Sequence, residues 1–158
     1  MANLTVTITE AVTLNGASRG STNTLTVSGV DDVYHRIVTI PANNDTTIAN
    51  FHAASSVSDS SLDVEDVKYI RVTNMDASNP INLSLQIDAG EDDSAADENV
   101  TILVEAGKSF IMGSPSDGIG VVDDSATLVS ALHNLESILV DSGTNAVQVE
   151  VFIASVVA

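Results

Sequence analysis

Two short stretches of the sequence match the ends of known catalytic motifs. Gly107-Lys108-Ser109 has the ending of a phosphate-binding loop, but Ile102 stands where such a loop needs its first glycine. The residues that follow do not read as a helix, so we interpret Gly107-Lys108 as a two-residue turn. Gly16–Gly20 matches the Gly-x-Ser-x-Gly pattern of a nucleophile elbow, which needs a helix after the serine. The next segment reads as another strand, so Ser18 is predicted to be a hairpin-loop serine.

The remaining candidates for chemistry are carboxylates and histidines. Asp88–Glu98 holds six carboxylates in 11 residues, and Asp92, Asp93 and Asp97 are the candidate ligands for calcium, which takes hard oxygen donors. The spacing does not fit an EF-hand, and we favour a solvated loop that joins two strands and blocks edge-to-edge pairing. The three histidines, at positions 35, 52 and 133, lack metal-ligand spacing. We therefore predict no catalytic residue, no cofactor and no enzymatic activity.

Composition limits the classes of partner. The 158 residues include 22 acidic and five basic side chains, for a formal net charge of −17, and no cysteine. A negatively charged surface repels nucleic acid and anionic membranes, because proteins bind both through positively charged side chains. Mean hydropathy is nevertheless positive (+0.23), which argues against a disordered acidic tail. The N-terminus shows no basic region followed by an apolar block, so we expect synthesis in a cytoplasm without a secretory signal.

Alternation of apolar and polar residues recurs along the whole chain and predicts strands. The clearest run is Ile81–Asp88, where every second residue is Ile or Leu. Clusters of Asn, Asp, Gly and Pro separate the runs and supply turns. Further strands are predicted at 3–9, 24–30, 33–40, 46–51, 67–74, 100–105, 109–113 and 147–153.

These elements predict an all-β fold in one domain over residues 1–158. Eight to ten short antiparallel strands with such turns indicate a β-sandwich or jelly roll, with at most one short helix. That helix would lie at Ser125–His133, where Leu128, Leu132 and Leu135 fall at helical spacing. A strand is nearly as well supported there, and both alternatives stay open. The apolar C-terminal run Phe152–Ala158 is expected in a sheet or at a subunit contact.

Several phrases of the sequence together resemble a known group of proteins. The phrases are "MANLTVTITEAVTLNG", "VYHRIVTIPANNDTTI", "KYIRVTNMDASNPINLSLQI", "EAGKSFIMGS" and "VQVEVFIAS". They resemble small, acidic, all-β virion structural proteins of tailed phages, particularly marine and cyanobacterial ones. The resemblance implies a non-enzymatic part of the particle, such as a capsid decoration or cement protein, commonly trimeric. It implies the major capsid protein or other virion proteins as partners, and a location in the virion after synthesis in the host cytoplasm.

Other functions stay open at this stage. A tail or fibre component fits the same resemblance. A cell-surface or filament subunit would assemble by pairing of terminal strands between chains. A calcium-dependent binding module would use the Asp88–Glu98 loop.

Overall fold

In the computed structural model of the chain, residues 2–52, 62–88, 98–113, 120–121 and 133–157 are described. All regular elements in these ranges are strands. Ten strands have five residues or more: β1 (Ala2–Thr9), β4 (Thr22–Val30), β5 (Asp32–Ile40), β6 (Asp45–His52), β8 (Val67–Asn74), β9 (Ile81–Asp88), β10 (Glu98–Val104), β11 (Ser109–Gly113), β13 (His133–Asp141) and β14 (Val147–Ser155). Four have two residues: β2 (Thr13–Leu14), β3 (Ala17–Ser18), β7 (Leu62–Asp63) and β12 (Gly120–Val121). None of the described segments is a helix long and apolar enough to cross a bilayer.

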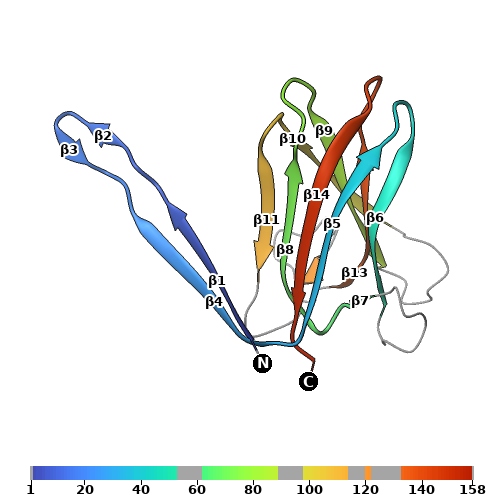
Figure 1. Cartoon of the computed structure of the whole chain (residues 1–158), viewed down its shortest axis with the longest axis horizontal. Coiled ribbons are helices and arrows are strands. Elements are labelled where there is room, and N and C mark those ends of the chain that lie inside the picture. Colours follow the sequence, from blue (N-terminus) through green and yellow to red (C-terminus); the bar gives the residue numbers. More distant parts are fainter. Residues whose placement is uncertain (1, 53–61, 89–97, 114–119, 122–132, 158) are drawn as a thin grey trace.

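Two sheets form the body of the molecule. The four-stranded sheet has the order β11-β8-β14-β5, and the six-stranded sheet has the order β10-β9-β13-β6-β7, with β12 paired to β13 (Figure 1). From β5 onward, successive long strands alternate between the two sheets, apart from β9 and β10, which are neighbours in one sheet. This order and alternation are the topology of a jelly roll.

Period-two patterning builds the core between the sheets. Val147, Val149, Val151 and Ile153 of β14 point inward, and Ile81 through Ile87 of β9 do the same at every second residue. All of these side chains except Ile87, which is also fully buried, belong to one cluster of 20 buried residues. Fully burying each such side chain contributes about 1.5–3 kcal/mol, so the alternation fixes which face of each strand turns inward.

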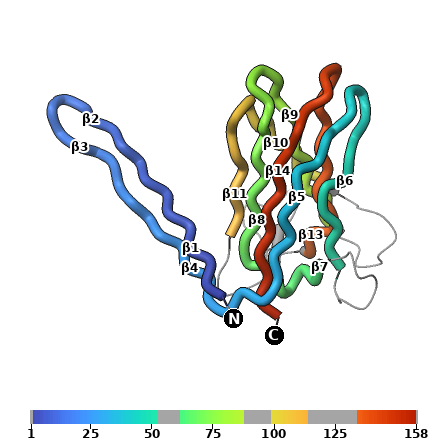
Figure 2. Tube along the Cα trace, viewed as in Figure 1, coloured from blue at the N-terminus to red at the C-terminus, as the bar shows by residue number. Residues whose placement is uncertain are grey.

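The N-terminal hairpin stands apart from the jelly roll. β1 and β4 pair antiparallel over their whole length, with β2 and β3 near the tip, and this hairpin projects away from the two sheets (Figure 1). We call residues Ala2–Val30 the arm. Figure 2 shows both chain termini at the base of the arm, where it joins the sandwich. A second cluster lies at this junction and contains Val27, Val30, Tyr69 and Ala154.

The predicted all-β sandwich or jelly roll is confirmed. The strand count is higher than the predicted eight to ten, because four two-residue strands accompany the long ones. Pairing is antiparallel with one correction, since β6 and β7 pair in parallel. Residues 125–132 of the possible helix lie outside the described residues, and His133 begins β13, a strand that the sequence analysis missed. The single domain over residues 1–158 stays a prediction.

Candidate functional site

Both motif fragments lie at or beside turns, with two corrections: the turn after β10 is centred on Ala106-Gly107, one residue earlier than predicted, and Ser18 lies in the two-residue strand β3 and not in the loop. Lys108 N–H donates to Glu105 C=O (3.1 Å), and Gly107 has a positive φ of 68°, which closes a four-residue turn. The turn carries the chain from β10 in one sheet to β11 in the other, so it is a crossover and not a hairpin. Ser18 pairs with Thr13 at the tip of the arm. The tip turn is Asn15-Gly16 with φ of 52° and 76°, the positive values that favour this dipeptide in tight hairpins.

Histidine 35 belongs to a polar network on the outer face of the four-stranded sheet. Its Nε2 donates to Glu150 Oε1 (2.8 Å), and Arg71 Nη1 donates to Glu150 Oε2 (2.7 Å). Arg71 also donates to Thr73, whose hydroxyl lies 2.8 Å from that of Ser109. The hydrogen bond from Arg71, followed by that from His35, lowers the pKa of Glu150.

This network ties all four strands of the sheet together across their outer face. His35 lies on β5, Glu150 on β14, Arg71 and Thr73 on β8, and Ser109 on β11. Each of these side chains has a partner within the network, and no hydroxyl of the described residues forms a hydrogen bond with the imidazole. The arrangement therefore supports the sheet and does not form a serine–histidine pair.

Aromatic contacts surround the same network. The Phe152 ring lies 6.1 Å from the Tyr69 ring and 5.7 Å from the His35 ring, centroid to centroid. The Arg71 guanidinium lies 5.9 Å from the Phe152 centroid. The outer face thus combines an ion pair with apolar surface, a mixture that suits contact with another protein.

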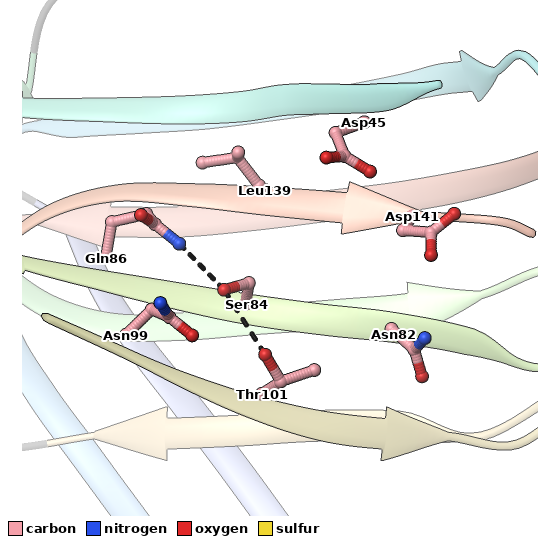
Figure 3. A pocket seen from close by; sticks show the side chains of 8 residues that line it. All are labelled: Asp45, Asn82, Ser84, Gln86, Asn99, Thr101, Leu139 and Asp141. Atoms are coloured by element: carbon pink, nitrogen blue, oxygen red, sulfur yellow. Dashed lines mark hydrogen bonds between the residues drawn. The ribbon is translucent and has the colours of Figure 1, made fainter. Parts of the chain in front are cut away.

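A shallow polar concavity lies on the outer face of the six-stranded sheet (Figure 3). It has a volume of about 330 Å³, and side chains from β6, β13, β9 and β10 stand on its floor. Gln86 Nε2 donates to Ser84 Oγ (2.7 Å), while Asp45 and Asp141 are opposite one another in the ladder. Like charges at directly opposite positions destabilise a strand pair. The strands of this sheet contain no Lys or Arg, so no basic strand residue compensates the negative charge at this end. The concavity offers hydrogen bonds, and none of the residues that line it in the described part of the chain is a histidine that could act as a base beside Ser84.

The calcium site stays a prediction. Asp92, Asp93 and Asp97 fall outside the described residues, in the segment that connects the paired strands β9 and β10. Within the described ranges, no group of three or more His, Asp or Glu side chains gathers at distances that would hold a metal ion.

The groove between the arm and the four-stranded sheet is the feature that the sequence analysis missed. Its volume is about 380 Å³. One wall is Leu4–Ile8 of β1, and the other contains Tyr69, Arg71, Ile111 and Phe152. A signal was present in the sequence, since the first 30 residues hold only one acidic and one basic side chain in an otherwise strongly acidic chain.

Comparison with known proteins leaves the family open. No protein-family model matches the chain, and no curated protein matches it. Among solved structures, the chain is similar to one described by the words "Bacillus endospore appendages form a novel family of disulfide-linked pili". The two share 11% identity over 79% of this chain and 89% of that chain, with a TM-score of 0.37. A likeness at this level carries no argument about function.

Proposed function

We propose that this protein is a non-enzymatic structural subunit of an assembled particle. The observation that carries the proposal is the arm, a hairpin with one apolar face that projects from the jelly roll. A two-stranded hairpin alone is marginally stable in water, so an exposed arm of this kind needs a neighbouring surface. The outer-face polar groups support the proposal too, because they bond to one another and form no nucleophile–base pair.

The finer assignment is a virion structural protein of a tailed phage, most of all a capsid decoration or cement protein. It rests on the sequence resemblance and on the acidic surface, which suits a shell in salty water where repulsion between copies is screened. Its partners would be the major capsid protein or other virion proteins, together with further copies of itself, with a trimer favoured. We propose no nucleic-acid or membrane partner. The protein would be made in the host cytoplasm and reside in the virion.

Quantitative mass spectrometry of purified particles tests this assignment. Particles from the source that encodes the chain should contain it in a fixed, stoichiometric ratio to the major capsid protein. Absence from the particles would refute the assignment. Location in a tail or fibre, which the same resemblance allows, would appear as a copy number matched to tail proteins.

A filament or cell-surface subunit is the second candidate. The free edges of β1 and β11 favour it, because among the described strands each pairs on one side only and can accept a strand from another chain. Purified protein that grows into fibres under electron microscopy would support this candidate over a particle component.

A further inference from the structure

The two faces of the arm differ sharply in chemistry. Cross-strand pairing places Leu4 beside Val27 and Val6 beside Leu25 on one face, with Ile8 next toward the tip. The other face presents six threonines, in the pairs Thr5–Thr26, Thr7–Thr24 and Thr9–Thr22. The apolar face is buried at the root, where Val27 is fully enclosed, but Ile8 is 48% exposed. The outer half of this face is therefore uncovered by the described parts of its own chain.

The apolar face looks into the groove, and the opposite wall is also partly apolar. Ile111, from β11, is 42% exposed and lines the groove together with Phe152. Farther along the same four-stranded sheet, Ile37 of β5 is 56% exposed. Two apolar surfaces thus face a space that the described residues leave open.

The arm and the strands of the four-stranded sheet carry little net charge, so they are not subject to the electrostatic repulsion between copies that affects the rest of the molecule. The arm contains Glu10 and Arg19, for a formal net charge of zero, so residues 31–158 carry the whole −17. Strands of the six-stranded sheet contain six acidic residues and no Lys or Arg. Strands of the four-stranded sheet contain three basic residues against two acidic ones. Two copies can approach arm to four-stranded sheet at far lower electrostatic cost than through their acidic sheets.

We propose that the arm of one copy occupies the groove of a second copy, with its apolar face packed against the outer face of that copy's four-stranded sheet. The strands of the arm are about 30 Å long, and two strands with their side chains are about 10 Å wide, so the uncovered outer half of the apolar face offers on the order of 150 Å². One contact, counted on both sides, then buries on the order of 300 Å². If every copy gives one arm and receives one, its two contacts together bury on the order of 600 Å², an area typical of a weak, concentration-dependent association. Mutual exchange, in a closed dimer or ring, therefore doubles the area that each copy buries.

The oligomeric state of the full chain tests this inference. At high salt, light scattering should give a multimer for the unchanged protein. Ile8→Asp on the arm and Ile111→Asp on the receiving sheet should each weaken association at least tenfold, because each places a carboxylate in the apolar contact. Leu103→Asp is the matched control, since Leu103 is 58% exposed on β10 of the other sheet. Circular dichroism and thermal melting establish that each variant folds.

Two results of this test would overturn the inference. One is a folded full chain that stays monomeric at all concentrations and salt levels. The other is a multimer that the two groove variants weaken no more than Leu103→Asp does.

Crosslinking distinguishes exchange of arms between two copies from packing of the arm on the four-stranded sheet of its own chain. The chain has no cysteine, so the double variant Ile8→Cys/Ile111→Cys contains the only two thiols. Under mild oxidation, exchange predicts disulfide bonds between chains, and mixing the two single variants should give a mixed dimer. A monomer with an internal disulfide as the sole product would show that the arm closes on its own sheet, which contradicts the inference.

For its biological meaning the inference rests on the proposed role as an assembling subunit, but the two can fail separately. A monomeric chain bound to particles would contradict arm exchange and leave the structural role standing. Arm-exchanged multimers of a chain that is absent from every particle would contradict the particle role and leave arm exchange standing.

Discussion

Replacing Val27 by alanine tests how the arm is held to the jelly roll. Val27 is fully buried and packs with Val30, Tyr69 and Ala154 in the root cluster, outside the main core. The change removes the equivalent of two methylenes, at about 0.8 kcal/mol each, and leaves a small cavity that adds to the loss. We expect the root contact to weaken by about 2 kcal/mol.

Val27→Ala should lower the free energy of opening the arm and leave the free energy of unfolding the sandwich unchanged, because the main core does not include Val27. A change of about 2 kcal/mol is about a 30-fold rise in the open population. Hydrogen exchange on dilute protein at low salt, where copies stay apart, should therefore show amides of β1 and β4 exchanging about 30-fold faster. Amides of β9 and β14 should keep their rates.

Thr26→Ala provides the control on the adjacent residue, which faces the exposed threonine side of the arm. It should change arm exchange only a few-fold, since it removes one cross-strand pair. Equal acceleration in the arm and the sandwich, or an arm unaffected by Val27→Ala, would refute the description of the root cluster as a separate anchor.

Three further predictions concern stability and association. Asn74 is buried and donates hydrogen bonds to Asn79 C=O and Val104 C=O. Asn74→Leu leaves both carbonyls without this donor, so it should lower the free energy of unfolding, measured by urea titration, by about 3 kcal/mol. A loss below about 1 kcal/mol would contradict this prediction. The pKa of Glu150 is lowered, so its stabilisation is present above the ordinary carboxyl pKa and is lost as pH falls through the folded value. The melting temperature of Glu150→Gln should thus lie below that of the unchanged protein near neutral pH, by the equivalent of about 0.5–1 kcal/mol. The difference between the two melting temperatures should disappear below about pH 4. A difference that does not depend on pH would argue against the ion pair. Self-association measured by sedimentation should strengthen between about 0.01 and 1 M salt, as the Debye length falls from about 30 to 3 Å, and weakening with salt would count against screened repulsion.

Strands with unbroken alternation could be predicted closely from the sequence. β8, β9 and β11 have the predicted bounds, and β14 extends the predicted strand by two residues. In β9, in β11 and in β14 as far as Ile153, each inward position is an apolar residue in phase, so the pattern alone identifies the buried face. The alternation of β8 is broken, because Tyr69 and Ile70 are both buried and the polar Asn74 is buried as well.

β13 shows why one strand was missed. Its inward residues are Leu135, Ile138 and Val140, and the ladder register shifts between Leu135 and Ser137. This bulge inserts an extra residue and breaks the period of two. Leu135 then matches the helical spacing from Leu128 and Leu132 as well as it matches a strand.

The candidate site was harder to predict than the fold. Alternation in β1 and β4 identifies an apolar face but does not say what covers it, so the same pattern fits a sandwich strand and a projecting arm. The pairing of Arg71 with Glu150 joins residues 79 positions apart, and only the sheet order brings them together. Charge counted by segment was the one sequence signal that pointed to the arm.

A reconstruction, at side-chain detail, of particles from the source that encodes this chain tests the central claim most directly. The account predicts that each copy contacts its neighbours through the arm and the outer face of the four-stranded sheet, with the acidic six-stranded sheet turned to solvent. Density in which the chain is missing, or in which isolated copies touch no neighbour through either surface, would contradict it.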